Sequence, residues 1–417
     1  MKKVMVCGCG AQGSTICRRL DEEPNIEEVV CADYNLAAAE AVCKLMKKGT
    51  PKQVNAAHVD EIAKAAEGCE LIVNVMPLEF GVNVMQAALQ IKACYQDLSA
   101  CENVVEGFPE YDTWLEGIKY MYTEYGKKFA ENGTTAIIGT GSAPGVMCVM
   151  ARKAVNELDE CDTIACMVYE GTRTKRFIPF FWSPEVALCD MEEDAYAFEN
   201  CQQIRTKPFS RPIKRNWPEC GREVTLVEHA HDEPVYIGFN REKYFKGCKN
   251  AYFKYGGTGI EFSEGLYKAG LLHHTPEEFD GHEIVPFDWV LKHIPMPPKD
   301  PEVIKSIIDE GIVEDNGAFV CEAYGKKDGK DIMVDLHVSS PGLEEAYERA
   351  KMTGEMYLTG QGAFLYTKLL VNDMVPQKGL ISSDMLDDQQ VEQYIAWAND
   401  LGITYTIDIK EGCKFDG

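Results

Sequence analysis

Long apolar runs are missing from this sequence of 417 residues. No stretch approaches the ~18 consecutive apolar residues of a membrane-spanning helix. The apolar stretch after Met1-Lys2-Lys3 is short and runs into glycines, and no small-residue cleavage site of a secretory signal follows it. We therefore expect a cytoplasmic protein without a membrane partner.

Basic residues are scarce. Lys and Arg total 42 against 67 Asp and Glu, which gives a formal net charge of −25. Nucleic acid and anionic lipid are bound chiefly through Lys and Arg, so the composition argues against both as partners. A cationic substrate would suit this charge, although net charge mostly governs solubility.

Paired cysteines are also absent, although the chain has 17 cysteines. They are scattered singly through apolar segments, without a Cys-x-x-Cys pair. This pattern predicts reduced, mostly buried thiols that pack as small hydrophobic side chains, and no structural disulfides. Cys7 and Cys9 lack a complementary Cys or His nearby, so we expect no metal there.

The first 150 residues read as alternating strands and helices. The opening stretch, KVMVCGCGAQGSTICRRL, is typical of a strand, a glycine-rich turn and a helix. Further strands are expected at 27–33, 69–77, 93–100 and 134–139, with helical segments between them. Residues 1–150 are therefore predicted to form an α/β Rossmann domain, a doubly wound parallel sheet.

The residue pattern changes after about residue 155, where the alternation of apolar and polar residues typical of strands dominates. Residues 151–345 are predicted to form an inserted mixed α+β domain for substrate binding and dimerisation. Within it, Asp328-Gly329 is a strong signal for a two-residue hairpin turn. Residues 346–417 are expected to supply C-terminal helices that return to the Rossmann domain.

The turn itself is a GxGxxG motif formed by Gly8, Gly10 and Gly13. In such a motif the glycines permit a tight turn, close approach to a pyrophosphate and close helix packing, and the helix amino terminus faces the phosphates. Asp33, 20 positions on at the end of the next strand, would bind the adenosine ribose and repel a 2′-phosphate. The motif therefore predicts NAD, with NADP less favoured; the alternative is a strand–turn–helix that binds another nucleotide or nothing.

Residues at the predicted strand ends complete the expected cofactor site, although each stretch could also be an ordinary turn. The expected cofactor-binding residues are Gly8, Gly10, Ala11, Gln12, Gly13, Asp33, Tyr34, Asn74, Met76, Pro77, Ser99, Gly139 and Gly141.

Catalytic candidates lie in the stretch Tyr95-Gln96-Asp97. A carboxylate and a phenol at a strand's carboxyl end could orient a substrate amine or exchange a proton with it. We take Asp97 as the first candidate acid or base and Tyr95 as the second; alternatively, Asp97 is a helix N-cap.

The expected substrate-binding residues are Ser142, Ala143 and Pro144, in a glycine-rich turn, and Arg173, which could bind a carboxylate beside aromatic residues. A solvated charge run is an equal alternative for Arg173. His229 and His231 share one face of a predicted strand, but two His are a weak metal signal, so no metal site is predicted.

These motifs resemble the saccharopine dehydrogenase family in the wide sense. That family includes saccharopine reductases, carboxynorspermidine and carboxyspermidine dehydrogenases, and lysine epsilon-dehydrogenases. The matching stretches are GCGAQG, ADYNLAAAEAV, LIVNVMP, YQDLS, GTGSAPGVMCVMARKAV, GLYKAGLL and QKGLISSDML. They span nearly the whole chain, although residues 173–250 match no part of the pattern.

The resemblance implies a Rossmann domain built from both chain ends and a homodimer. It also implies reversible, nicotinamide-dependent oxidation of a C–N bond in an amino-acid or polyamine derivative, with an active site near Asp97 and Ser142. Saccharopine reductases tend to have Asp at the position of Ala143 and Tyr at the position of Asp97. We therefore expect an amine or amino-acid dehydrogenase nearer to the lysine epsilon-dehydrogenase type.

Two alternatives stay open. The first is the reverse reaction, an NADPH-dependent reductive coupling of an aldehyde and an amine, as in carboxynorspermidine-type or saccharopine-type enzymes. The second is a catalytically inactive, NAD-binding regulatory protein, which Ala143 would allow.

Overall fold

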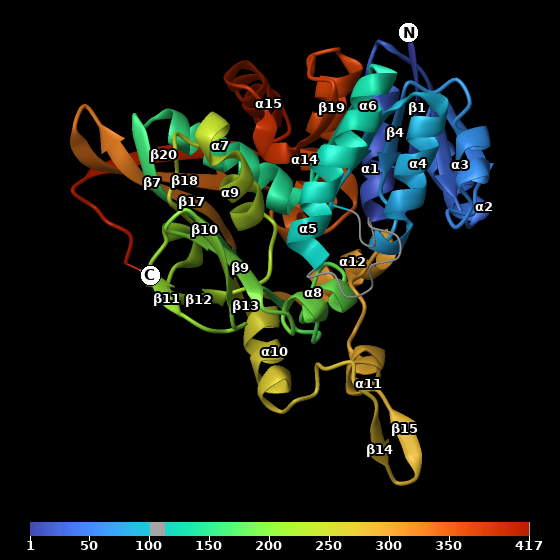
Figure 1. The fold of residues 1–417 in the computed structure, drawn as a ribbon. Coiled ribbons are helices and arrows are strands. Elements are labelled where there is room, and N and C mark those ends of the chain that lie inside the picture. The colour runs from blue at the N-terminus through green and yellow to red at the C-terminus, as the bar shows by residue number, and fades with distance from the viewer. Residues whose placement is uncertain (101–112, 417) are drawn as a thin grey trace. The chain divides into compact units, whose positions relative to one another are not determined.

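The computed structural model describes residues 1–100 and 113–416. The chain divides into two compact units (Figure 1). Unit 1 contains residues 1–149 and 358–401, and unit 2 contains residues 150–357 and 402–417.

Unit 1 is built on a seven-stranded sheet in which every neighbouring pair is parallel. The strand order is β19-β6-β5-β4-β1-β2-β3, which contains the Rossmann order and confirms the predicted fold class. The strands are β1 (Lys2–Cys7), β2 (Ile26–Asp33), β3 (Gly49–Gln53), β4 (Leu71–Asn74), β5 (Cys94–Asp97), β6 (Thr135–Ile138) and β19 (Gly379–Ser382).

Helices of unit 1 pack along this sheet. In α1 the residues Gly13, Ile16, Cys17 and Leu20 are buried, and their three- and four-residue spacing places them on one helix face. The helices that lie wholly or partly in unit 1 are α1 (Ala11–Glu22), α2 (Leu36–Cys43), α3 (Val59–Ala65), α4 (Gly81–Ile91), α5 (Thr113–Tyr120), α6 (Gly126–Asn132), α7 (Met147–Asn156), α14 (Gly354–Val371) and α15 (Asp388–Asp400). Short 3₁₀ and π-helical turns are η1 (Leu78–Phe80), η2 (Met121–Tyr125), η3 (Ser142–Val146) and η5 (Ser383–Met385).

Unit 2 is built on a nine-stranded mixed sheet. Its main path is β10-β9-β13-β7-β17-β18-β20; β12 pairs with β13 and also with β11. Only β13 and β7 run parallel among these pairs. The strands are β7 (Glu160–Glu170), β9 (Ala195–Glu199), β10 (Gln202–Thr206), β11 (Ile213–Arg215), β12 (Val224–Glu228), β13 (Asn250–Gly257), β17 (Ala318–Lys327), β18 (Lys330–Ser339) and β20 (Thr404–Glu411).

Asp328 and Gly329 form the tight turn between β17 and β18, as predicted. Both have positive φ, 51° and 75°, which is the backbone that a two-residue hairpin turn requires. The smaller elements of unit 2 are two strand pairs, β8 (Thr172–Thr174) with β16 (Ile312–Asp315) and β14 (Glu277–Phe279) with β15 (His282–Ile284). Its other helices are α8 (Pro184–Asp190), η4 (Pro218–Cys220), α9 (Glu233–Tyr244), α10 (Thr258–Lys268), α11 (Pro286–His293), α12 (Pro301–Glu310) and α13 (Leu343–Ala350).

The segment 346–417 is not helical throughout, contrary to expectation. The stretch TYTIDIKE at 404–411 alternates with period two and pairs with β18 as the edge strand β20. Residues 379–382 form β19 beside β6 in unit 1.

Within the described ranges, no helix has the length and apolar character needed to cross a membrane.

Candidate active site

The glycine-rich turn has the geometry of a dinucleotide cradle. Gly8 has φ +105°, and a Cβ there would lie 2.8 Å from the Val75 carbonyl oxygen. A Cβ on Gly13 would lie 1.8 Å from the Gly8 carbonyl oxygen, so α1 can start this close to β1 only with glycine. A Cβ on Gly10 would meet nothing within 4 Å. The space at Gly10 and the amino terminus of α1 therefore fit a pyrophosphate.

Asp33 is fixed beside this turn by two backbone hydrogen bonds. Its Oδ2 accepts from the Cys9 N–H at 2.8 Å and its Oδ1 from the Asn35 N–H at 2.8 Å. Each carboxylate oxygen keeps a second acceptor site, which a ribose hydroxyl can use. Tyr34 is 66% exposed, and the buried Oε1 of Gln12 has no hydrogen-bond partner within the described ranges. Asp33 and Tyr34 therefore fit the adenosine half of a dinucleotide, whereas Gln12 Oε1 lies beside Gly360 of α14.

The residues after β4 and β5 lie at the carboxyl edge of the same sheet. Asn74 Oδ1 accepts from the Met76 N–H at 3.1 Å and so shapes the loop after β4. Met76 is half-buried, and Pro77 and Ser99 are exposed. Carboxyl ends of parallel strands are where such sheets bind ligands, and the cofactor-binding roles of these residues stay predictions.

Tyr95 and Asp97 belong to a buried network that joins β4, β5 and the end of β6. The Tyr95 hydroxyl donates to Asp97 Oδ2 at 3.0 Å and accepts from Asn74 Nδ2 at 3.0 Å. Asp97 Oδ1 accepts from the Gly139 N–H at 2.8 Å. Tyr95 is 0% exposed and Asp97 1%. These contacts describe a positioning network, and the acid–base roles of both side chains stay predictions.

The glycine-rich turn after β6 adjoins the loop after β5. The Gly141 N–H donates to the Leu98 carbonyl oxygen at 2.9 Å. Ser142 begins the π-helical turn η3, and its Oγ accepts from Thr359 Oγ1 at 3.0 Å. Ala143 is half-buried and Pro144 buried. Thus Gly139, Gly141 and Ser142 lie together at the carboxyl edge of the unit 1 sheet.

Arg173 lies in unit 2, on β8. Its Nε pairs with Glu314 Oε2 at 3.0 Å across the β8–β16 strand pair. Its side chain is 43% exposed. The guanidinium is therefore already partnered, and a substrate carboxylate would compete with Glu314.

Unit 2 contains an acidic and aromatic cluster that the sequence motifs did not predict, formed by Glu170, Trp182, Tyr255 and Glu355. Trp182 Nε1 donates to Glu170 Oε2 at 3.3 Å, and Tyr255 hydrogen-bonds to the same carboxyl group. The parallel pairing of β13 with β7 sets Gly257 opposite Glu170 and so brings the two strand ends together. The cluster residues are widely separated in the sequence, which gives no signal of their proximity.

Glu170 is electrostatically unusual. Burial raises the pKa of its carboxyl to about 8, and the charge of Glu355 raises it further in the same direction. The residue still keeps part of its surface open to solvent. An ammonium group would relieve the repulsion between the two carboxylates, and the rings of Trp182 and Tyr255 would add cation–π faces. The cluster therefore suits a cationic amine.

The two histidines at 229 and 231 lie near this cluster. The His229 ring is 4.8 Å from the Tyr255 ring, and burial holds the His229 pKa well below its usual value. The His231 ring stacks on Phe253 at 4.0 Å, and its Nδ1 contacts Glu233 Oε2 at 2.5 Å. No group of three or more His, Cys, Asp or Glu side chains is placed to hold a metal ion in residues 1–100 and 113–416.

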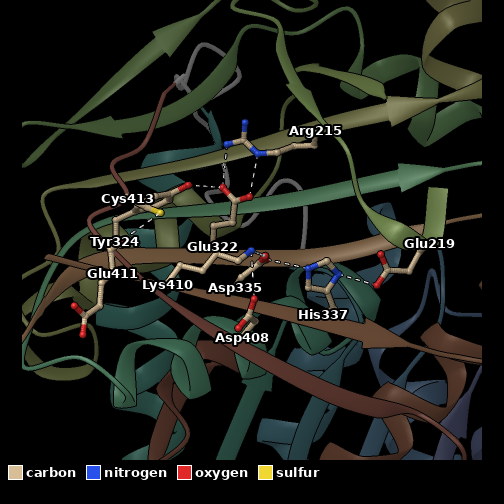
Figure 2. Close-up of polar contacts among 10 residues, drawn as sticks. All are labelled: Arg215, Glu219, Glu322, Tyr324, Asp335, His337, Asp408, Lys410, Glu411 and Cys413. Atoms are coloured by element: carbon tan, nitrogen blue, oxygen red, sulfur yellow. Dashed lines mark hydrogen bonds and ion pairs between the residues drawn. The ribbon is translucent and has the colours of Figure 1, made fainter. Parts of the chain in front are cut away.

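A second polar network lines a cavity of about 670 Å³ on one face of the unit 2 sheet. Strand register sets Glu322 opposite Asp335, and Asp335 opposite Asp408. Figure 2 shows that Arg215 binds Glu322 through two hydrogen bonds of 2.9 Å, and that Lys410 binds Asp335 at 2.8 Å. The two most buried carboxylates are thus paired within the protein, which indicates a structural network.

His337 connects this network to the η4 turn (Figure 2). Its Nδ1 lies 2.8 Å from Glu219 Oε1 and its Nε2 lies 2.9 Å from Asp335 Oδ1. Burial alone would lower the pKa of His337, but the two carboxylates raise it above the usual value. The imidazolium is therefore the form that the fold stabilises.

This arrangement predicts a pH-dependent stability. Because the folded pKa is raised, the contribution of His337 is fully present below the unfolded pKa of about 6.5 and is lost as pH rises through the folded value. In His337→Gln, unfolding measured by denaturant titration should lose this pH dependence, worth roughly 1 kcal/mol. His282→Gln, at an exposed position on β15, is the control. An unchanged pH profile in His337→Gln would contradict the assignment.

Comparisons with known proteins agree with the fold and with the dinucleotide turn. Residues 4–137 match the saccharopine dehydrogenase NADP binding domain. Carboxynorspermidine synthase of Vibrio alginolyticus is 28% identical over 358 residues, which is 82% of this chain and 79% of that protein. Carboxyaminopropylagmatine dehydrogenase of a Synechocystis species is 22% identical over 435 residues, which covers all of both chains.

Among solved structures, apo saccharopine dehydrogenase (L-Glu forming) from Saccharomyces cerevisiae superposes with a TM-score of 0.69 at 14% identity. The match covers 99% of this chain and 100% of that one. At this identity the likeness concerns the fold. The chain is therefore similar to enzymes of the saccharopine dehydrogenase type: residues 4–137 match their NADP binding domain, and the named relatives align over most of its length.

Proposed function

We propose that this protein is an NAD(P)-dependent oxidoreductase that makes or breaks a C–N bond of a small amine or amino-acid derivative. The observation that carries the proposal is the dinucleotide turn, in which Gly8, Gly10 and Gly13 leave the space that a pyrophosphate needs. The bound nicotinamide would accept or donate the hydride. The relatives named carboxynorspermidine synthase and carboxyaminopropylagmatine dehydrogenase support an amine substrate.

We assign the cofactor as NAD in preference to NADP. The supporting observation is Asp33, whose carboxylate is held beside the turn by the N–H groups of Cys9 and Asn35. A fixed negative charge at this position repels a 2′-phosphate and accepts the ribose hydroxyls of NAD. The matching domain model carries NADP in its name, so the choice between the two cofactors is the part of the proposal that most needs a direct test.

The substrate's ammonium group is assigned to the cluster of Glu170, Trp182 and Tyr255 in unit 2. A carboxyl group with a raised pKa binds an ammonium in its ionised form and can also exchange a proton with an amine near neutral pH. Substrate binding by Ser142, Ala143 and Pro144, in unit 1, stays a prediction. Arg173 would bind a substrate carboxylate only if its ion pair with Glu314 broke.

The network of Asn74, Tyr95 and Asp97 has a structural role in this proposal. It fixes the loops after β4 and β6, which carry Met76 and Gly139. Hydride transfer is sensitive to small displacements of the reacting groups, so rigid loops at the carboxyl edge of the sheet contribute to rate. Proton transfer by Asp97 or Tyr95 stays a prediction, as does assembly into a homodimer.

The direction of the reaction is tested by assaying both cofactor reduction and cofactor oxidation. Purified protein is tested for NADH or NADPH formation from lysine, saccharopine, carboxyspermidine and simple diamines, and for reduced-cofactor consumption with an aldehyde plus a diamine. Turnover in either direction supports C–N redox chemistry, and faster consumption would favour reductive coupling. Tight cofactor binding without any turnover would instead support the inactive regulatory protein.

The cofactor assignment is tested by Asp33→Asn, which keeps an acceptor oxygen but removes the charge. We expect the ratio of kcat/KM for NADP⁺ to that for NAD⁺ to rise by roughly 10- to 100-fold, equivalent to about 1.4 to 2.7 kcal/mol. Asp21→Asn is the matched control, because Asp21 also accepts two backbone N–H groups, from Lys47 and Lys48. A wild-type preference for NADP⁺ would show that Asp33 does not select NAD.

A further inference from the structure

Four cysteine side chains of unit 1 meet behind the dinucleotide turn. The Sγ atoms of Cys17, on α1, and Cys31, on β2, are 3.5 Å apart. The Cys9 thiol donates to the Ala32 carbonyl oxygen at 3.6 Å, next to Cys31, and Cys9 and Cys43 both influence the pKa of Cys31. Cys17 and Cys31 are fully buried. Cysteines that look scattered in the sequence are therefore a contiguous thiol cluster at the adenosine end of the proposed cofactor site.

We propose that Cys9, Cys17 and Cys31 form a peroxide-sensitive switch that controls dinucleotide binding. The effect on binding rests on the proposed function, but the disulfide itself can be measured without any cofactor. Asp33 connects the thiol cluster to dinucleotide binding. Its carboxylate accepts a hydrogen bond from the Cys9 N–H, and Asp33 lies two residues after Cys31 on β2.

Cys9 is the thiol through which an oxidant enters. It is 7% exposed, it adjoins the exposed Gly10 and it directly precedes the amino end of α1, which favours an anion. Interaction with Cys17 and then Cys31 lowers the pKa of Cys9, whereas the pKa values of Cys17 and Cys31 are raised. Since the thiolate is the reactive form, Cys9 is the nucleophile of the cluster.

The oxidation takes three balanced steps. The Cys9 thiolate attacks hydrogen peroxide, forms a sulfenic acid and releases hydroxide. The Cys17 thiol then attacks the Cys9 sulfur, which forms a Cys9–Cys17 disulfide and releases water. Finally the Cys31 thiol attacks the Cys17 sulfur, gives its proton to the hydroxide from the first step and expels the Cys9 thiolate, a good leaving group because of its lowered pKa. The product is a Cys17–Cys31 disulfide, with two thiols oxidised and one peroxide reduced to water.

This disulfide changes the cofactor site. Its sulfurs must approach from 3.5 Å to about 2.05 Å. The approach draws α1 and β2 together about one helical turn after Gly13, where α1 starts in close contact with the Gly8 carbonyl oxygen of the dinucleotide turn. We expect the dissociation constant of the dinucleotide to rise by about tenfold, equivalent to about 1.4 kcal/mol. A bound dinucleotide should in turn slow the oxidation, because it covers the turn that contains Cys9.

The experiment treats the reduced protein with hydrogen peroxide and follows two signals. Trypsin leaves Cys9 and Cys17 in peptide 4–18 and Cys31 in peptide 20–44, so the predicted disulfide links these two peptides until a reductant is added. Dinucleotide affinity is measured in parallel from NADH and NADPH fluorescence. We expect the linked peptides to appear together with weakened binding, and both changes to reverse with dithiothreitol.

Two variants identify the roles. Cys9→Ser should oxidise at least tenfold more slowly than the wild type, and Cys31→Ala should never form the linked peptides. Cys201→Ser, at an exposed thiol of unit 2, should behave like the wild type. Absence of the linked peptides, or linkage that leaves NADH and NADPH affinity unchanged, would overturn the switch. Linkage in a protein that binds neither dinucleotide even when reduced would instead contradict the proposed function.

Discussion

The Gly10→Ala variant is expected to fold like the wild type while it binds dinucleotide roughly 30-fold more weakly, a loss of about 2 kcal/mol. Gly10 has φ −73° and ψ −160°, which alanine adopts without strain, and the added methyl group meets no protein atom within 4 Å. The methyl group would occupy the space that the pyrophosphate needs. Titration of NADH and NADPH fluorescence measures the affinity, and thermal unfolding measures the stability.

Gly13→Ala is the matched comparison for this variant. Its Cβ would lie 1.8 Å from the Gly8 carbonyl oxygen, so α1 must shift away from β1. We expect Gly13→Ala to lower the free energy of unfolding by about 1 to 3 kcal/mol, whereas Gly10→Ala leaves it unchanged. If Gly10→Ala bound dinucleotide as tightly as the wild type, the pyrophosphate would not lie over Gly10.

The Glu170→Gln variant is expected to lower kcat/KM for the amine substrate by about 100-fold, equivalent to about 2.7 kcal/mol. Glutamine has nearly the same shape but cannot pair with an ammonium as a carboxylate does. The pH dependence should change as well. In the wild type, kcat/KM should rise with pH as Glu170 ionises near its pKa of about 8, and this rise should be absent from the variant.

Folding and substrate binding are separable in this test. Because Glu170 is half-buried close to Glu355, replacing it with a neutral side chain removes the desolvation penalty and the like-charge repulsion of the ionised form, so thermal stability should hold or increase. Glu278→Gln, at an exposed position on β14, is the charge-matched control. Trp182→Phe keeps a ring but loses the Nε1–H bond to Glu170 and should show an intermediate loss. Unaltered amine kinetics in Glu170→Gln would exclude the cluster from substrate binding.

Local sequence rules predicted the features of this protein that local geometry decides. The GxGxxG turn depends on backbone space at three nearby positions, and the structure leaves that space at Gly8, Gly10 and Gly13. Asp328-Gly329 forms a hairpin because both residues tolerate positive φ. The strand and helix periodicities likewise predicted the parallel sheet of unit 1. Residues 404–411 were wrongly assigned to a helical segment, although their two-residue alternation was present in the sequence.

Contacts between distant residues were decided only by the tertiary structure. Tyr255 binds the Glu170 carboxyl from 85 positions away because β13 pairs in parallel with β7, and Trp182 binds it from the segment before α8, 12 positions away. The pKa of Glu170 follows from that burial and not from its neighbours in the chain. Asp97 was predicted as a base from its position at a strand end, and only the structure shows that its carboxylate accepts hydrogen bonds from the Tyr95 hydroxyl and the Gly139 N–H.

By itself, the sequence determined that this chain forms a Rossmann sheet with a dinucleotide turn, because turn chemistry and residue periodicity act over a few positions. The tertiary structure alone decided which carboxylates, rings and thiols meet. Strand register and helix packing set the distances between these groups. They bring together segments that are far apart in the sequence, so local sequence patterns do not show which residues will meet.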